Sequence, residues 1–290
     1  MTLFLKSRHK EASGVLLLGL VFLQVFSLLD AVFAAERRPV VNDGAYGVFI
    51  DYTDSSSDMS EMQGYSTIVI DAYDFTADGI AQLHDRGQKV FSYLSIGAIK
   101  RSDGYYSDFS DITLGSCRDE ENTYWVDVTQ ERWVNFFLDS LASVLRDKKV
   151  DGFLLDHTNI YDELDRNDIY DALVELVDRL DQLGVPIYVN NGYEFVDQLI
   201  SDGKAGMIDG ISVENVFTRI RDRKSGRYGM QEPSLRRERQ SYLQKCHSRG
   251  LAVYMLEYSK SRAMSKRIER YAKDNGFAFY TLSRTLREDS

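Results

Sequence analysis

Short apolar runs alternate with amphipathic segments along the chain from Tyr46 onward. This alternation is typical of βα units, in which a buried parallel strand is followed by a helix that covers the sheet. The apolar runs predict eight strands: Tyr46–Asp51, Thr67–Asp71, Lys89–Ser95, Val150–Asp156, Val185–Asn190, Ile208–Glu214, Leu251–Glu257 and Phe277–Leu282. Apolar residues at helical spacing predict the helices between them: Thr76–Arg86, Gln130–Asp147, Asp168–Leu183, Glu194–Ser201, Leu235–Ser248 and Ser261–Asn275.

Eight strands within about 250 residues predict an α/β fold, a (β/α)8 TIM barrel formed by one domain over residues 36–290. The chain has 290 residues and is 43% hydrophobic, which suffices for one large core. The alternative is an open doubly wound sheet, but the glycine-rich phosphate turn expected after its first strand is missing. One long stretch, Gly97–Thr129, follows the third strand, and we expect it to shape the substrate cleft.

The first 35 residues have the pattern of a secretory signal peptide. Three basic residues precede an apolar run, Gly14–Leu29, and small residues follow it, with cleavage expected near Ala34 or Ala35. The alternative is an uncleaved membrane anchor, because the run approaches the length of a short transmembrane helix. We expect a secreted, extracellular domain, or a cell-surface or periplasmic one if the segment is retained.

The formal net charge of −10 argues against a nucleic-acid partner and suits neutral or cationic partners. No later stretch is long and apolar enough to span a membrane, so we expect no membrane contact beyond the signal segment. The two cysteines, Cys117 and Cys246, and the four histidines show no metal-ligand spacing. We therefore predict neither a metal site nor a cofactor.

Five predicted strands end in an acid: Asp51, Asp71, Asp156, Glu214 and Glu257. In a barrel these strand ends lie together on the C-terminal face, where the chemistry of this fold takes place. Aspartate also caps the helix or turn that follows a strand, so capping and substrate binding both remain open for Asp51 and Asp71. Glutamate is a poorer cap, which favours a functional role for Glu214 and Glu257.

Two of these strands match residue for residue. Val150-Asp-Gly-Phe-Leu-Leu-Asp156 and Ile208-Asp-Gly-Ile-Ser-Val-Glu214 have the same length, so they place Asp156 and Glu214 at the same height on strands four and six. Their backbones should lie roughly 9–10 Å apart, and side chains that converge from there fit either a retaining or an inverting glycosidase. Asp151 and Asp209 lie at the opposite ends of these strands and are interpreted as turn residues.

Tyrosines also lie at the strand ends. A tyrosine there can stack on the face of a sugar, or it can pack against other side chains of the barrel rim. Both roles remain open for Tyr93, Tyr193 and Tyr258.

The motifs, taken in order, resemble those of the endo-α-1,4-polygalactosaminidases, glycoside hydrolase family 114. They are Tyr93-Leu-Ser-Ile-Gly97, Asp151-Gly-Phe-Leu-Leu-Asp156, Asn190-Asn-Gly192, Asp209-Gly-Ile-Ser-Val-Glu214 and Leu256-Glu-Tyr258. The resemblance implies a secreted or surface TIM barrel that cuts polysaccharides of α-1,4-linked galactosamine and N-acetylgalactosamine. Asp156 and Glu214 match the family's presumed catalytic pair.

A further analogy, with barrels of the α-galactosidase type, implies that Asp156 is the nucleophile and Glu214 the acid/base of a retaining reaction. The substrate contacts expected from the strand ends and the resemblance are Asp51, Asp71, Tyr93, Asn190, Tyr193, Glu257 and Tyr258.

Two positions differ from the family pattern. Ala98-Ile-Lys100 follows the first motif where members often carry an acid, and Tyr193 stands where many have a second glycine. Two alternatives follow: a non-catalytic carbohydrate-binding barrel, or a glycosidase on a different polysaccharide. A Ca²⁺ site in the acid cluster is a third, but the regularly spaced ligands of a known loop motif are missing.

Overall fold

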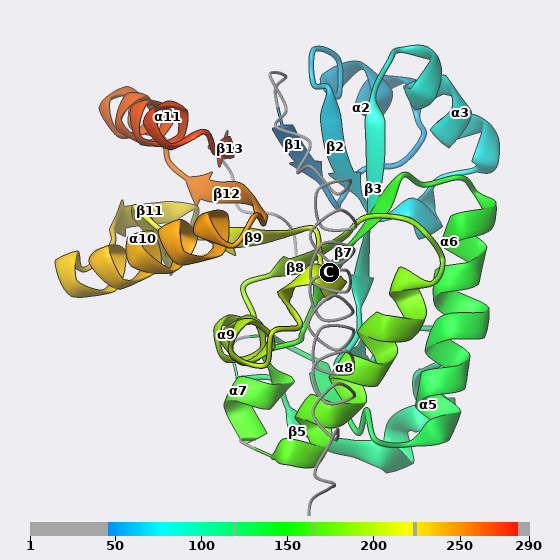
Figure 1. Ribbon diagram of the computed structural model, residues 1–290. Helices are drawn as coiled ribbons and strands as arrows, with labels where there is room; N and C mark the ends of the chain where they lie inside the picture. Colours follow the sequence, from blue (N-terminus) through cyan, green and yellow to red (C-terminus); the bar gives the residue numbers. More distant parts are fainter. Residues whose placement is uncertain (1–45, 119, 165, 223–224, 284–290) are drawn as a thin grey trace, which may run out of the picture. The chain divides into compact units, whose positions relative to one another are not determined.

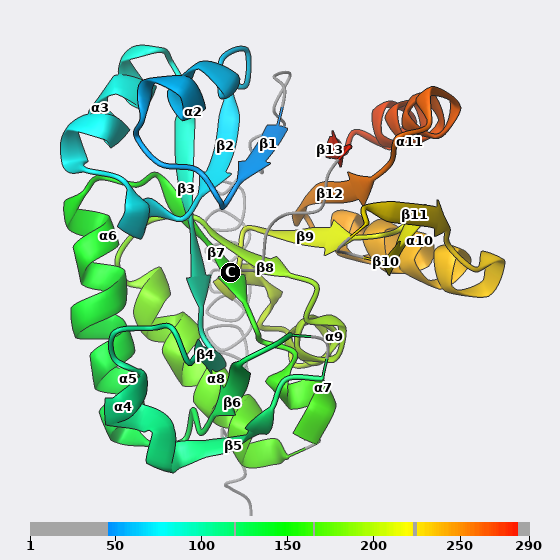
Figure 2. The same ribbon diagram turned by 180° about the vertical axis from the view of Figure 1, so that it is seen from behind.

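Eight parallel strands form the central sheet, in the hydrogen-bonded order β1-β2-β3-β7-β8-β9-β12-β13. They span Tyr46–Phe49 (β1), Thr67–Ile70 (β2), Lys89–Ser95 (β3), Gly152–Asp156 (β7), Ile187–Asn190 (β8), Gly210–Glu214 (β9), Ala252–Tyr258 (β12) and Ala278–Leu282 (β13). The sheet curls until its edge strands are neighbours, with the rings of Phe49 and Tyr280 5.7 Å apart. The computed structural model confirms the predicted TIM barrel and all eight strands (Figures 1 and 2).

The structure describes residues 46–118, 120–164, 166–222 and 225–283, which belong to one unit, Pro39–Ser290. The predicted signal segment, residues 1–35, lies outside the described residues. Within the described ranges, no helix combines the length and the apolar character needed to cross a membrane. Cys117 and Cys246 are both buried and free.

Side chains alternate between the barrel interior and the outer face of the sheet, as the two-residue period of a strand requires. Val69, Phe91 and Leu154 belong to the interior cluster, and the ring of Phe91 stacks on that of Tyr188 at 4.6 Å. The intervening residues, such as Val90, belong to the outer cluster with the helices. Because both faces are buried, the strands are continuous apolar runs, which is why the sequence predicted them.

The six predicted helices are all present. They are α3 (Ala77–Asp85), α5 (Glu131–Phe136) with its continuation through a π-helical turn (Phe137–Ala142) into α6 (Ser143–Asp147), α8 (Asn167–Asp181), α9 (Tyr193–Ser201), α10 (Pro233–Ser248) and α11 (Arg262–Asn275). Trp133 on α5 is fully buried, and its ring nitrogen donates to the carbonyl of Ile96 at 3.0 Å. Three short helices were not predicted: α2 (Ser56–Glu61), α4 (Tyr106–Phe109) and α7 (Ile160–Leu164).

Two small antiparallel sheets follow the C-terminal ends of barrel strands. The stretch after β3 contains β4 (Ala98–Lys100), β5 (Thr113–Ser116) and β6 (Thr123–Val126), paired in the order β4-β6-β5. It lies beyond the tip of β3 in Figure 2. The stretch after β9 forms a hairpin of β10 (Thr218–Asp222) and β11 (Arg227–Met230). Both insertions therefore start from the face where the strand-end acids lie.

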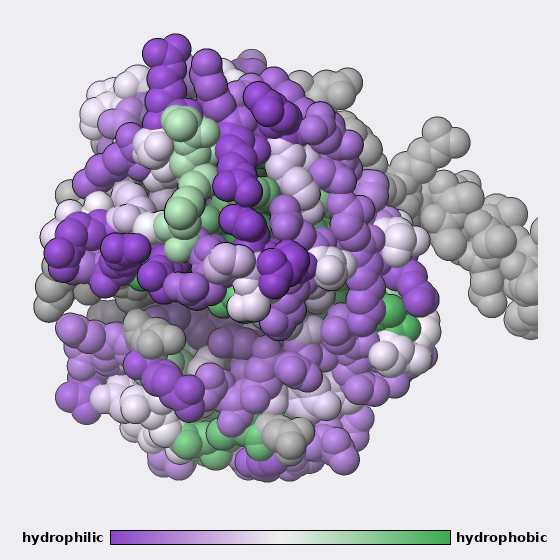
Figure 3. Space-filling model, turned by 90° about the vertical axis from the view of Figure 1, so that its left-hand side faces the viewer, coloured by the Kyte–Doolittle hydropathy of each residue, from purple (hydrophilic) through white to green (hydrophobic). Residues whose placement is uncertain are grey.

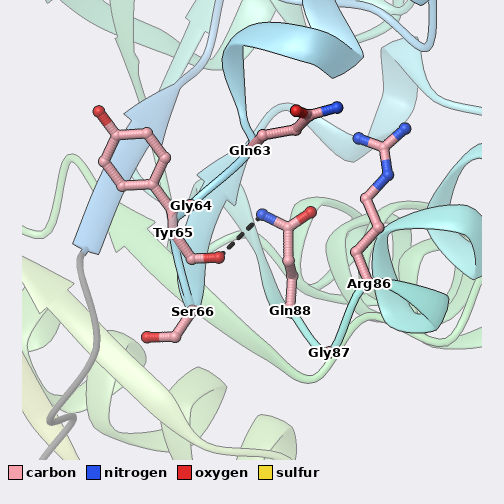
Figure 4. Close-up of a pocket in the computed structure, with 7 residues that line it drawn as sticks. All are labelled: Gln63, Gly64, Tyr65, Ser66, Arg86, Gly87 and Gln88. Atoms are coloured by element: carbon pink, nitrogen blue, oxygen red, sulfur yellow. Dashed lines mark hydrogen bonds between the residues drawn. The ribbon is translucent and has the colours of Figure 1, made fainter.

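A cavity of about 350 Å³ lies at the other end of the barrel, before β2 and β3, and is lined by residues 63–66 and 86–88 (Figure 4). Gln88 donates from its side-chain amide to the carbonyls of Met62 at 2.7 Å and Tyr65 at 3.0 Å. Arg86 donates to the carbonyl of Met59 at 2.6 Å. These side chains bind main-chain carbonyls, so they hold α2 against β3 and are not arranged for catalysis.

Candidate active site

Three successive barrel strands end in polar side chains that share hydrogen bonds: Asp156 on β7, Asn190 on β8 and Glu214 on β9. The amide nitrogen of Asn190 donates to Asp156 Oδ1 at 3.2 Å and to Glu214 Oε1 at 3.1 Å. Because both oxygens bind the same nitrogen, they lie no more than 6.3 Å apart, which is the sum of the two distances. The structure thus brings together the two acids that the matched strands placed at one height.

The residue after each of these side chains has a left-handed backbone: His157 (φ 64°), Asn191 (φ 52°) and Asn215 (φ 61°). This conformation is uncommon outside glycine, and Asn and His are among the residues that adopt it most readily. It turns the backbone N–H of His157 toward Asp156 Oδ1 at 2.9 Å, and the Asn191 side-chain oxygen accepts from the backbone N–H of Glu214 at 3.1 Å. The turns therefore hold the acids that precede them.

Glu214 is also held by the neighbouring strand on its other side, β12. The hydroxyl of Tyr258, on β12, donates to Glu214 Oε2 at 3.0 Å, so Asn190 and Tyr258 bind different oxygens of one carboxylate. Arg239 on α10 donates to the main-chain carbonyls of Glu214 at 3.0 Å and Asn215 at 2.8 Å. Arg239 was not predicted from the sequence, because nothing in the pattern of α10 singles it out.

Tyr93 lies on β3, between β2, which precedes Asp71, and β7, which ends at Asp156. Burial, and next the charge of Asp156, raise the pKa of Tyr93 well above its usual range, and the two side chains form a hydrogen bond. The charge of Asp71 also acts on Tyr93. Asp71 itself caps the short 3-10 helix Ala72–Asp74 by accepting from the N–H of Tyr73 at 3.1 Å. Asp51 lies half-buried in the turn that follows β1.

Tyr193, the first residue of α9, packs against side chains of α10. Its ring packs against Tyr242 at 4.8 Å, and the guanidinium of Arg239 lies 5.8 Å from its centre. Burial raises the pKa of Tyr193 to about 12. This position supports the packing alternative for Tyr193 over contact with substrate.

Glu257 lies on the other face of its strand. Leu256 and Tyr258 belong to the interior cluster, so alternation points Glu257 outward, and its side chain is fully buried. Its carboxylate accepts from the N–H of Phe217 at 2.8 Å and from the N–H and hydroxyl of Thr218 at 3.0 and 2.5 Å. The expected contact with substrate does not fit this position, and Glu257 instead anchors the start of β10.

His157 and Glu120 are site neighbours that the sequence did not indicate. The ring of His157 lies between Ser95, 3.0 Å from Nδ1, and Glu120, 3.1 Å from Nε2. Glu120 comes from the loop between β5 and β6, about forty residues earlier in the chain, so its approach depends on how the insertion folds. The sequence feature that could have indicated His157 is its position directly after an acid at a strand end.

The two Asp-Gly pairs lie at the opposite end, as expected. Asp151 accepts from the N–H of Val90 at 2.7 Å, and Asp209 accepts from the N–H of Ile187 at 2.9 Å. Each one accepts from a backbone N–H at the start of a neighbouring strand. Across the described parts of the chain, no three His, Cys, Asp or Glu side chains are grouped so that they could hold a metal ion.

Comparisons with known proteins agree with the barrel fold. Among solved structures, the chain is similar to the glycoside hydrolase domain of PelA from Pseudomonas aeruginosa, with 17% identity over 82% of this chain and 94% of that chain, and a TM-score of 0.69. It is also similar to Ega3 from Aspergillus fumigatus, solved in complex with galactosamine, with 17% identity over 82% and 90% of the two chains and a TM-score of 0.64. An α-galactosidase from Thermus thermophilus matches with 13% identity over 86% and 60% of the two chains and a TM-score of 0.53.

A search of curated protein sequences gave no match. The sequence profile of glycoside-hydrolase family GH114, however, matches residues 33–290. Because this match covers most of the chain, the protein belongs to family GH114 and is a glycoside hydrolase.

Proposed function

We propose that the protein is an endo-acting, retaining hydrolase of polysaccharides that contain α-1,4-linked galactosamine or N-acetylgalactosamine, with Asp156 as nucleophile and Glu214 as acid/base. The observation that carries the proposal is the separation of the two carboxylates. A retaining pair lies about 5–5.5 Å apart and an inverting pair about 6.5–9.5 Å apart. The shared donor Asn190 keeps these two oxygens within 6.3 Å of each other, which favours retention.

In the first step, Asp156 attacks the anomeric carbon while Glu214 gives its proton to the leaving oxygen. This breaks the glycosidic bond and forms a bond between the sugar and Asp156. In the second step, Glu214 takes a proton from water, and the water oxygen displaces Asp156 from the same face that the leaving group had occupied. Asn190 donates to both carboxylates, so it keeps their relative orientation through both steps.

Tyr93, whose pKa is affected by the charge of Asp156, and Asp71, whose charge also acts on Tyr93, are the sequence-predicted residues that we retain as substrate contacts. Asp51, at the end of β1, stays in the same proposed group. Asn190 and Tyr258 act on the catalytic carboxylates directly through their hydrogen bonds.

The charge distribution supports a substrate with free amines. Residues 1–217 contain 37 acidic and 17 basic side chains, whereas residues 218–290 contain 8 acidic and 18 basic ones. The side of the molecule that carries α10 and α11 is strongly hydrophilic, and Arg262, Lys266 and Arg270 are exposed on α11 (Figure 3). A cationic polymer is attracted to the acidic part and repelled from the basic helices. We also propose export from the cell, which the N-terminal pattern supports.

The test compares the protein with its Asp156→Asn and Glu214→Gln variants on partially deacetylated α-1,4-galactosamine polymer, with release of oligosaccharides as the measurement. We expect each variant to lose turnover by about 10³-fold or more while it still binds the polymer. Asp139→Asn and Glu175→Gln, two exposed helix positions, are matched controls and should keep wild-type turnover. Oligosaccharide release by Asp156→Asn or Glu214→Gln at the wild-type rate would overturn the assignment.

Azide separates the two roles. With Glu214→Ala, azide should displace Asp156 from the covalent intermediate and yield an α-glycosyl azide. With Asp156→Ala, azide takes the place of the missing nucleophile and should yield a β-glycosyl azide. The opposite pairing of product and variant would exchange the roles, and inverted sugar products from the wild-type protein would exclude retention.

A further inference from the structure

His157 directly follows the proposed nucleophile and is buried, with 3% of its surface exposed. Its left-handed backbone gives the N–H that binds Asp156. Its ring lies between the end of β3 and the inserted sheet: Ser95 ends β3, Glu120 lies between β5 and β6, and the ring centre of Trp125 on β6 is 5.8 Å from that of His157, with the two rings packed edge to face. The side chain of His157 therefore connects the turn that follows Asp156 to the β4-β6-β5 insertion.

The hydrogen bonds fix where the protons of this group lie. The hydroxyl of Ser95 has a single proton, which it donates to the carbonyl of Ala98 at 2.6 Å. Nδ1 of His157, 3.0 Å from the same hydroxyl oxygen, must then be the donor of that contact. Nε2 faces both oxygens of Glu120, at 3.1 and 3.2 Å, and an ionised carboxylate only accepts. Both ring nitrogens therefore carry a proton, and the ring is an imidazolium.

The charges around the ring support this state. Burial lowers the pKa of His157, but the charge of Asp156 and the hydrogen bond and charge of Glu120 outweigh it, against a smaller opposing effect of Lys100, so the pKa is raised overall. Burial raises the pKa of Glu120, but its hydrogen bond to His157 and the charges of His157 and Lys100 bring it below the usual value. Both partners thus favour the ion pair over a neutral pair.

We propose that His157 is a positioning residue of the active site: as an imidazolium held by Ser95 and Glu120, it fixes the turn that orients Asp156 and ties the β5–β6 loop to the barrel rim. This inference rests on the proposed role of Asp156 as nucleophile. It also gives the inserted sheet a role in catalysis, because Glu120 binds the ring of the residue that follows the nucleophile. If the imidazolium of His157 lost one proton, either Nδ1 or Nε2 could no longer donate to Ser95 or Glu120. The loss of that hydrogen bond would loosen the turn.

The first measurement is the protonation state of His157 in the full chain without substrate, by nitrogen NMR of ¹⁵N-labelled histidine, with the signal assigned by its loss in His157→Asn. We expect imidazolium shifts for both ring nitrogens at pH 7. In Glu120→Gln, which keeps an acceptor and removes the charge, His157 should titrate about one to three pH units lower. A neutral ring at pH 7 in the wild-type protein would overturn the proposal, whatever the turnover.

The second measurement is turnover. Asn tolerates the left-handed backbone, so His157→Asn should fold, and we expect kcat to fall about 10²-fold with KM changed less than about three-fold. His247→Asn, an exposed histidine on α10, is the control and should match the wild-type protein. A lower melting temperature with unchanged kcat would assign His157 a structural role only. If Asp156→Asn stays active, the proposed function fails, while the NMR result still decides the state of the ring.

Discussion

The carboxyl group of Glu257 offers a test of the fold beside the active site. It is fully buried and accepts three hydrogen bonds from Phe217 and Thr218. Burial raises the pKa of Glu257 from 4.5 to about 7, although the hydrogen bonds with Thr218 and Phe217 act in the opposite direction. The substitution Glu257→Gln keeps the shape of the side chain and removes its titration.

The sign of the effect follows from proton binding. Between pH 4.5 and about 7, the folded protein keeps a proton on Glu257 that the unfolded chain has released. The free energy of unfolding of the wild-type protein therefore falls as pH rises through this window, and the contribution is constant above it. A difference of about 2.5 pH units corresponds to about 3 kcal/mol. In the Gln variant, this titration does not lower the free energy of unfolding at any pH.

Urea unfolding of both proteins at pH 4.5 and pH 8 provides the assay. Gln replaces one acceptor by an amide donor, which should make the variant about 1–3 kcal/mol less stable at pH 4.5. At pH 8 this deficit should shrink or reverse, because the wild-type protein has lost about 3 kcal/mol and the variant has not. Glu238→Gln on the surface of α10 serves as the control for removal of one carboxylate. A deficit of the same size at both pH values would refute the reasoning.

Three further predictions concern the rim of the barrel. Asn190→Ala removes the donor that Asp156 and Glu214 share, and kcat on the galactosamine polymer should fall about 10²-fold; a wild-type kcat would contradict the bridging role. Arg239→Met keeps the length of the side chain but removes the guanidinium that donates to the carbonyls of Glu214 and Asn215, although the Asn215 carbonyl still accepts from Gln231, so kcat should fall about 10-fold with KM unchanged, whereas an effect on KM alone would argue against positioning. Gly97→Ala places a methyl carbon 2.2 Å from the carbonyl oxygen of His157 and should lower the free energy of unfolding in urea by about 1–3 kcal/mol; equal stability would show that this turn is free to move.

The strands were predictable because burial on both faces makes each a continuous apolar run between polar turns. The β4-β6-β5 sheet was not predictable in the same way. Its edge strands are short, and β5, Thr113–Ser116, is partly exposed, so its residues form no apolar run. Hydrogen bonds to β6 and packing against the rim define it, and both depend on the finished barrel.

The candidate pair was predictable from local pattern, since the two strands have equal length and start with the same Asp-Gly turn. The supporting residues were not, because they come from elsewhere in the chain. Glu120 arrives from the insertion after β3, and Arg239 from the helix after β11. Their contacts are between distant segments, and no short stretch of sequence contains both partners.

Glu214 and Glu257 each end a predicted strand, so the sequence pattern does not distinguish them. They differ in the face of the strand on which they lie, and a shift of one residue along a strand changes that face. On β9, Ile211 and Val213 pack on the outer face, so Glu214 points into the barrel. On β12, Leu256 pairs with Glu214 in the register of the sheet, and both Leu256 and Tyr258 point inward, so Glu257 between them lies among the outer residues. The strand also runs through Tyr258, one residue past the predicted end. Because the side-chain period is two, an error of one residue at a strand end turns a candidate for substrate binding into a buried structural acid.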